Sequence, residues 1–210
     1  MKISVIGASS GVGLQCVQRA LKRGHAVTTL SRSPLPVNPS NDLLIIRGSA
    51  SNKEDIKKTI KDADAVLVSI GTGKSVKATT LYSDAAQVLV EARDELGTDI
   101  PFIVLTGFGA GNSGQFHTGY MKFVFRFILQ RVYENKTRME TIIAASRMRW
   151  VFVRPGVLTD KEISEKYRVE TRYYKGMRIG SIARSDVADF MVKQAENPSA
   201  IGQYAALSNK

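Results

Sequence analysis

The stretch Gly7-Ala8-Ser9-Ser10-Gly11-Val12-Gly13 decides the fold, because it separates two segments of different hydrophobic character. Residues 3–6 form a short apolar run before it, and an apolar-periodic pattern begins after it at Leu14. This order predicts a strand, a glycine turn and a helix. Such a junction is typical of dinucleotide-binding domains.

Each glycine of this turn has a separate physical role. Gly7 would permit the tight turn, Gly11 would let a pyrophosphate approach the main chain, and Gly13 would let the helix pack closely on the sheet. The phosphates would lie against the N–H groups and positive dipole end of the helix. The spacing is G-x-x-x-G-x-G rather than G-x-G-x-x-G. Because a structural turn has the same composition, the inference depends on its position between strand and helix. We expect the cofactor to be contacted here by Gly7, Ser9, Ser10, Gly11, Val12 and Gly13.

Further strand-like runs follow along the chain, with helical patterns between most of them. The six runs are residues 3–6, 26–30, 43–46, 65–69, 102–106 and 150–154. The continuous apolar character of 66–68 and 103–105 fits strands that are buried on both faces of a parallel sheet. Right-handed crossovers then predict an α/β fold, a doubly wound, three-layer Rossmann sheet with strand order 3-2-1-4-5-6.

The chain of 210 residues suits one NAD(P)-binding domain covering all of it. Residues 157–210 would form a smaller, dependent segment on the substrate side. In it we expect short strands near 167–173 and 204–207, with a helix between them that is capped by Ser185-Asp186. Gly24 should end the first helix in a left-handed conformation.

Composition limits the partners and the location of the protein. Lys and Arg number 30 against 19 Asp and Glu, a net charge of +11, which favours anionic partners. The basic residues are dispersed, so a nucleic-acid role rests on net charge alone. The single Cys16 is expected to be a buried small hydrophobe, in keeping with a reducing compartment. With no long apolar run for a membrane span, we expect a cytoplasmic location.

The residues after the second strand-like run bear on which dinucleotide is bound. Ser31-Arg32-Ser33 stands where an NAD-binding fold places an acidic residue for the ribose 2′-hydroxyl, and no carboxylate appears before Asp42. An arginine fork with neighbouring hydroxyls matches a 2′-phosphate, so the sequence favours NADP(H). An exposed loop arginine is the simpler alternative.

Ligands of open α/β sheets bind beyond the carboxyl ends of the strands, so the residues that follow each strand are the candidates. They are Ser69, Gly71 and Thr72 after the fourth strand, Thr106 after the fifth, and Pro155, Gly156 and Val157 after the sixth. Small side chains in the first loop would lie beside the ribose and pyrophosphate. The backbone amides of residues 154–157 would be offered to the nicotinamide carboxamide.

Together these motifs resemble the short-chain dehydrogenase/reductase superfamily, in particular its atypical NAD(P)-binding branch that includes NADPH-dependent flavin and biliverdin-IX-beta reductases. The resemblance covers nearly the whole chain. It is carried by residues 7–13, 30–32, 71–72, 79–80, 85–86 and 136–140, and by the WVFVRPG segment 150–156.

The resemblance implies roles for two residues. Thr106 matches a Ser or Thr position near the nicotinamide, where a hydroxyl can orient a substrate oxygen, and Lys136 matches the lysine that contacts the cofactor ribose. The family's Tyr-x-x-x-Lys pair is out of register, because Val132 occupies its tyrosine position and Tyr133 is one residue later. A shift of one residue rotates a helical side chain by about 100°. Tyr133 therefore does not simply inherit the role of acid.

Without that acid, hydride transfer to a conjugated acceptor becomes the favoured chemistry, since such an acceptor delocalises charge and can take its proton from water. Phe108, Phe116 and Tyr120 could form an apolar platform, although plain packing explains aromatic side chains equally well. His117 could donate a proton or face solvent.

The segment 120–132 is apolar on most sides and, at 13 residues, too short to span a bilayer. A core or lid helix, for which the glycine-rich loop 107–114 would be a hinge, is the first interpretation. A dimer contact or a weak membrane-surface contact is the alternative, and the protein would be a monomer or a homodimer.

The sequence thus favours an NADPH-dependent oxidoreductase that passes hydride to a small flavin-like, quinone-like or other conjugated acceptor. A non-catalytic NADP(H)-binding redox sensor with a protein partner remains an alternative, because sensors of this superfamily also have degraded catalytic residues. An epimerase or dehydratase would need the missing tyrosine and a larger substrate domain. No metal site is expected.

Overall fold

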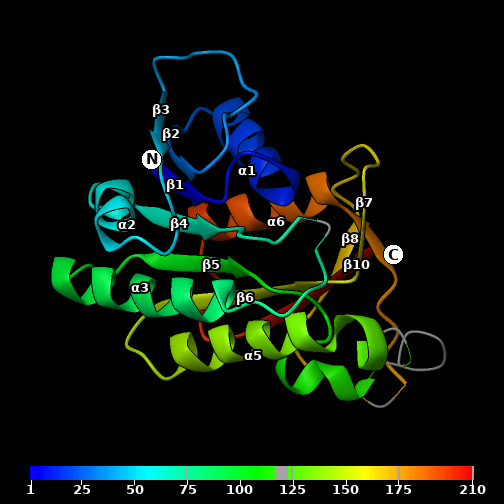
Figure 1. Ribbon diagram of the computed structural model, residues 1–210. Helices are drawn as coiled ribbons and strands as arrows, with labels where there is room; N and C mark the ends of the chain where they lie inside the picture. Colours follow the sequence, from blue (N-terminus) through cyan, green and yellow to red (C-terminus); the bar gives the residue numbers. More distant parts are fainter. Residues whose placement is uncertain (74, 117–122, 124, 175, 210) are drawn as a thin grey trace.

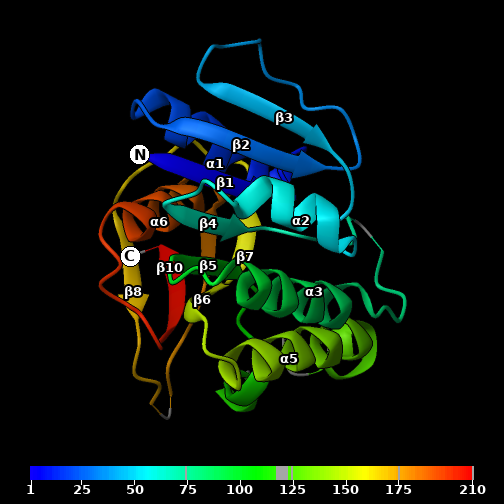
Figure 2. The same ribbon diagram turned by 90° about the vertical axis from the view of Figure 1, so that its left-hand side faces the viewer.

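The computed structural model describes residues 1–73, 75–116, 123, 125–174 and 176–209. Its centre is an eight-stranded sheet with the order β3-β2-β1-β4-β5-β6-β10-β8, which Figure 2 shows with β3 at the upper edge. The strands are β1 (Lys2–Ile6), β2 (Ala26–Ser31), β3 (Leu43–Arg47), β4 (Ala65–Val68), β5 (Pro101–Leu105), β6 (Arg149–Pro155), β8 (Tyr167–Glu170) and β10 (Tyr204–Asn209). Neighbouring strands are parallel except β10 and β8, which are antiparallel. The predicted order of the first six strands is confirmed.

Helices cover both faces of this sheet and make the predicted three layers (Figure 1). On one face lie α1 (Gly11–Lys22) and α6 (Arg184–Glu196), and on the other lie α2 (Lys53–Ile60), α3 (Leu81–Leu96) and α5 (Gln130–Ala144). Each face has its own apolar core, because the strands between them bury side chains in both directions.

A second, small sheet stands beyond the carboxyl end of β6. It consists of β7 (Val157–Thr159) paired in parallel with β9 (Ser181–Ala183), and the sequence patterns did not predict it. A 3-10 helix (Gly111–Phe116) follows β5, and a π-helical turn (Phe125–Leu129) precedes α5. These short elements surround the carboxyl edge of the main sheet.

The turn between β1 and α1 is as tight as its glycines suggest. A Cβ atom on Gly13 would lie 2.1 Å from the carbonyl oxygen of Gly7, too close for any side chain. Gly7 has φ +86° and a Cβ there would meet the carbonyl of Ser69 at 2.4 Å. The first turn of α1 is therefore held directly against the carboxyl edge of β1.

The predicted helix ends are right in one case and wrong in the other. Gly24 has a φ of 79° and follows α1 as its left-handed terminating residue. The cap of α6 is not Ser185-Asp186, because the N-cap is Ala183, with no side-chain hydrogen bond. Asp186 is buried and instead accepts hydrogen bonds from the backbone N–H groups of Ser164 and Glu165, both at 2.8 Å. The Asp186 carboxylate therefore binds the backbone amides of the preceding loop and does not cap the helix.

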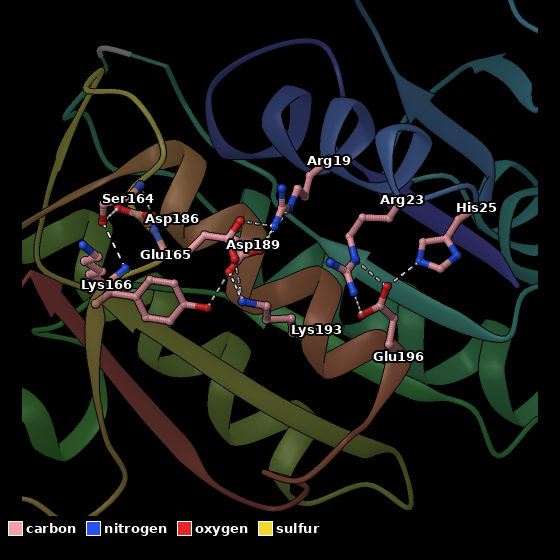
Figure 3. A network of polar contacts seen from close by, with 11 residues as sticks. Arg19, Arg23, His25, Ser164, Glu165, Lys166, Asp186, Asp189, Lys193 and Glu196 are labelled. Carbon is pink, nitrogen blue, oxygen red and sulfur yellow. Dashed lines mark hydrogen bonds and ion pairs between the residues drawn. The ribbon is translucent and has the colours of Figure 1, made fainter.

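A polar network joins α6 to α1 and to β8 (Figure 3). Its centre is Asp189, fully buried, which accepts hydrogen bonds from Arg19 Nε at 2.9 Å and Tyr167 Oη at 2.8 Å and lies 2.7 Å from Lys193 Nζ. Burial alone would raise the pKa of Asp189, but the hydrogen bonds from Lys193, Tyr167 and Arg19 lower it below its ordinary value. The ionised carboxylate is therefore part of the native packing of α6.

We expect Asp189→Asn to lower the free energy of unfolding at pH 7 by about 1–3 kcal/mol, because two cations lose their shared partner. Because the pKa of Asp189 is lower in the folded protein than in the unfolded chain, where it is about 3.9, its ionisation stabilises the fold at pH values above the unfolded-state pKa. This stability is lost as the pH falls through the folded-state pKa. The variant should therefore lose less stability than wild type below pH 4. Urea unfolding from pH 3 to 8 measures both effects.

The matched control is Asp160→Asn, because that carboxylate also pairs with an arginine but is 89% exposed. Its effect should stay within about 0.5 kcal/mol. Equal effects of the two variants would contradict a structural role for the buried network.

Candidate functional site

The carboxyl edge of the sheet opens into a cavity of about 1280 Å³. Of the residues predicted to hold the cofactor, all but Gly13 line it. They are Gly7, Ser9, Ser10, Gly11, Val12, Ser31, Arg32, Ser69, Gly71, Thr72, Thr106, Lys136, Pro155, Gly156 and Val157. Gly13 is buried in the contact between α1 and β1. Loops distant in the sequence thus form one continuous groove.

The first turn of α1 lines one end of this groove, where the sequence predicts the pyrophosphate. Gly11 has φ +56°, and a Cβ built on it would meet no atom within 4 Å, so it would project into open space. The first turn contains no acidic residue, and the N-cap Ser10 makes no side-chain capping bond. Unshielded amides and an open approach are what an anionic ligand requires at a helix N-terminus.

The end of β2 carries the residues predicted to bind a 2′-phosphate. Arg32 is exposed and lines the cavity, while the hydroxyl of Ser31 donates to Ser33 O at 2.8 Å. Arg47, which the sequence reading missed, donates from Nε to Arg32 O at 3.3 Å. Of the described residues that line the cavity, Arg32, Lys136 and Arg184 are basic and none is acidic. This charge distribution suits a polyanionic cofactor.

Thr106 lies at the end of β5, but its hydroxyl does not face a ligand as expected. It is buried and donates to Glu140 Oε1 at 2.7 Å. The same carboxylate receives Arg154 in a two-pronged pair, with Nε–Oε1 at 2.9 Å and Nη2–Oε2 at 2.6 Å. Arg154 also donates to Asn112 Oδ1 at 2.7 Å. Because the Thr106 hydroxyl donates to the buried Glu140–Arg154 pair, Thr106 helps to fix α5 against β6.

Lys136 projects from α5 toward the end of β5. Its Nζ donates to Thr106 O at 2.6 Å and lies 4.7 Å from the ring centre of Tyr133 and 5.4 Å from that of Tyr82. Burial lowers the pKa of Lys136 to about 8, against a weaker upward effect of Glu140. The amine can therefore change its charge near neutral pH.

Tyr133 also lines the cavity, although it is out of the family register. A Cβ on Gly107 would lie 2.7 Å from its hydroxyl, which places the phenol against the loop after β5. Lys136 Nζ lies over the ring of Tyr133, 4.7 Å from its centre. Burial, with a smaller contribution from Tyr82, raises the pKa of Tyr133 to about 12. In a Tyr-x-x-x-Lys pair the neighbouring ammonium lowers the pKa of the phenol, whereas the pKa of Tyr133 is raised. Tyr133 therefore does not have the properties of that lysine-activated acid.

The expectation for the backbone after β6 is wrong in its detail. The N–H of Gly156 donates to Leu207 O and that of Val157 donates to Gly180 O, both at 3.0 Å, so neither amide is offered to a ligand. The Gly156 amide is used by β10 of the main sheet, and the Val157 amide is used by the residue that precedes β9. A Cβ on Gly156 would lie 1.9 Å from Gly180 O, which explains the glycine.

The other side of the small sheet supplies lining residues that no motif indicated. They are Ile179, Gly180, Ser181 and Arg184. A strand of three residues is too short to show a recognisable hydrophobic period. The sequence therefore did not predict that these side chains lie at the edge of the sheet.

The predicted aromatic platform is only partly placed. Phe108 lines the cavity, with its ring 5.9 Å from that of Tyr173, whereas Phe116 packs on the same tyrosine at 5.8 Å and is not a lining residue. His117 and Tyr120 lie outside the described residues.

Some described side chains of the apolar segment 120–132 line the cavity, and others are exposed on the surface. Leu129 and Val132 line the cavity, but Phe123, Phe127 and Ile128 are exposed, at 57%, 66% and 48%. A purely core helix is therefore wrong for this segment. No helix within the described residues is long and apolar enough to cross a membrane.

Replacing Arg32 with alanine tests the 2′-phosphate position. We expect NADPH affinity to fall about tenfold or more, because a charge-assisted fork is lost, while NADH affinity stays the same. Isothermal titration of both dinucleotides measures this. Arg147→Ala, at an 83% exposed side chain before β6, is the control. Equal wild-type affinity for NADPH and NADH would contradict the assignment of Arg32 to the 2′-phosphate.

Comparisons with known proteins agree with this geometry. The curated Reductase pytE of Aspergillus terreus is 23% identical over 97% of this chain and 94% of its own length. Among solved structures, the anaerobillin reductase ChuY of Escherichia coli O157:H7 superposes with a TM-score of 0.78 at 19% identity, covering 100% of this chain and 97% of that one. A protein of Streptococcus pneumoniae TIGR4 assigned as an NADH-flavin reductase gives 0.79 at 24% identity, with 100% of both chains covered. The model of the NAD(P)H-binding family matches residues 7–198, and the chain belongs to that family.

Proposed function

We propose that this protein is an NADPH-dependent reductase that delivers hydride to a conjugated small-molecule acceptor. The observation that carries the proposal is a dinucleotide cavity with a basic lining, beside which the usual lysine-activated tyrosine is absent from its register. Bound NADPH would supply the hydride, and water would supply the proton.

The residues of the chain have distinct parts in this proposal. The first turn of α1 holds the pyrophosphate, Arg32 binds the 2′-phosphate, and Lys136 anchors the nicotinamide ribose. The loop Ser69 to Thr72 borders the ribose and pyrophosphate. Glu140, through Arg154 and Thr106, fixes the walls of the nicotinamide end.

The acceptor class follows from the groups available to protonate it. Reduction of an isolated carbonyl needs an acid at the developing alkoxide, but burial raises the pKa of Tyr133 to about 12 and the Thr106 hydroxyl donates its proton to Glu140. The Lys136 amine donates to Thr106 O, and in this proposal its other donors bind the cofactor ribose. A flavin, quinone or linear tetrapyrrole spreads the charge and needs mainly proximity and an apolar wall. Phe108 and Leu158 contribute to such a wall. The names of the flavin and anaerobillin reductases among the similar structures support the same class.

The direct test is NADPH oxidation at 340 nm with three acceptor types: a free flavin, a benzoquinone and a linear tetrapyrrole. Turnover with at least one is expected, and Arg32→Ala should raise the apparent KM for NADPH about tenfold without changing kcat. Tight NADPH binding without turnover on any of them would contradict the reductase proposal.

The amine of Lys136 gives the reaction a pH dependence. Its pKa of about 8 means that the charged form, which donates to the ribose, decreases as the pH rises through that value. We expect kcat/KM for NADPH to fall above pH 8 in wild type. Lys136→Met should be roughly tenfold slower at pH 7 and lack this descending limb. An unchanged limb in the variant would exclude Lys136 as its source.

A non-catalytic redox sensor is the second candidate, favoured by one observation. Phe123 and Phe127 lie on the surface with ring centres 4.6 Å apart and ring planes tilted by 41°, close in sequence to the cavity residue Leu129. Exposed aromatic pairs often mark interaction sites. For a sensor, affinity for a partner should differ between the NADPH and NADP+ complexes, with no turnover in either.

A further inference from the structure

Among the described residues that line the cavity, Arg184 is the one cationic side chain that the motifs leave without a role. It is the first residue of α6 and lines the same cavity as Gly7, Ser9 and Gly11. Its position follows β9, in a part of the chain with no nucleotide motif. A guanidinium in a cavity with a basic lining can form charge-assisted hydrogen bonds with an anionic ligand.

The topology places Arg184 beside the first turn of α1. Both α1 and α6 return the chain from the carboxyl edge of the sheet to the start of a parallel strand, so the two helices run in the same direction. Side chains meet along their length, with Cys16 Sγ 4.0 Å from Met191 Sδ and Arg23 Nε 2.6 Å from Glu196 Oε1 (Figure 3 shows the second pair). The N-terminal ends of the helices therefore lie together at the edge where the pyrophosphate is expected.

The present partner of Arg184 leaves its guanidinium able to bind a ligand. Nη1 donates to Asp160 Oδ1 at 2.7 Å, and that carboxylate is 89% exposed. An exposed pair of this kind is weak, and a guanidinium has five N–H donors in all. Asp160 can thus orient the side chain without using its whole donor set.

The loop that contains Asp160 is itself fixed to α6. Asp186 accepts the N–H groups of Ser164 and Glu165 (Figure 3), and Ser185 Oγ donates to Lys161 O at 3.2 Å. These bonds hold the loop next to the start of α6. The arginine is therefore positioned by a built contact and not left on a free surface.

We propose that Arg184 binds the pyrophosphate oxygens of the dinucleotide and so completes, from α6, the anion site at the N-terminus of α1. This rests on the dinucleotide binding assumed in the proposed function. Arg32 and Arg184 then have separable tasks, because the first contacts a phosphate that only NADP(H) has and the second contacts one that both dinucleotides share.

The test is a binding matrix measured by titration, with no turnover required. Arg184→Ala should weaken both NADPH and NADH about tenfold and leave adenosine 2′-phosphate, which lacks a pyrophosphate, unchanged. Arg32→Ala should weaken NADPH and adenosine 2′-phosphate and spare NADH. Lys161→Ala, the same charge change on the neighbouring loop, should leave all three affinities unchanged.

Arg184→Lys covers the case in which the alanine variant fails to fold, and circular dichroism melting checks both. It keeps the charge but loses the fork, so it should lose about threefold in affinity for both dinucleotides. Unchanged dinucleotide affinity in the folded variants overturns the proposal, and a rise in acceptor KM alone would assign Arg184 to an anionic acceptor instead. If wild type binds neither dinucleotide, the proposed function fails first.

Discussion

The cavity depends on the contact between Gly13 and Gly7, which lets the first turn of α1 rest directly on the end of β1. Any side chain on Gly13 would overlap the Gly7 carbonyl, since its Cβ would lie only 2.1 Å away. A displaced helix would move its free N–H groups away from the groove and separate α1 from α6. The proposed anion site and the hydrogen bond from Arg19 of α1 to Asp189 of α6 both require α1 to stay in this position.

A second constraint acts at the opposite end of the groove. Arg154 and Glu140 are almost completely buried, at 1% and 3%, and satisfy each other in a two-pronged pair. Removing one partner would leave an uncompensated buried charge, which is far more costly than the pair itself. The pair also takes the Thr106 proton. The same interaction that makes the wall rigid removes a potential acid from the chemistry.

The sequence was sufficient for the parts that have strong local patterns. The glycine turn, the long apolar strands and their crossovers predicted six strands in their right order and brought nearly all of the proposed cofactor residues to one edge. It was not sufficient for β7 and β9, because a strand of three residues is too short to show a period. Nor did it indicate that the Gly156 and Val157 amides bond to Leu207 and Gly180. The predicted capping role of Asp186 is wrong because a capping pattern cannot reveal that Ser164 and Glu165, 22 and 21 residues earlier, donate to the same carboxylate. Arg184 carried no signal, since only the fold places α6 beside α1.

The most direct test of the account is a crystal structure of the protein with NADPH. The account predicts the 2′-phosphate at Arg32, the pyrophosphate between the first turns of α1 and α6, and the nicotinamide between the loops that follow β5 and β6. A dinucleotide bound in another orientation, or a nicotinamide that does not reach the walls fixed by Glu140 and Arg154, would contradict it.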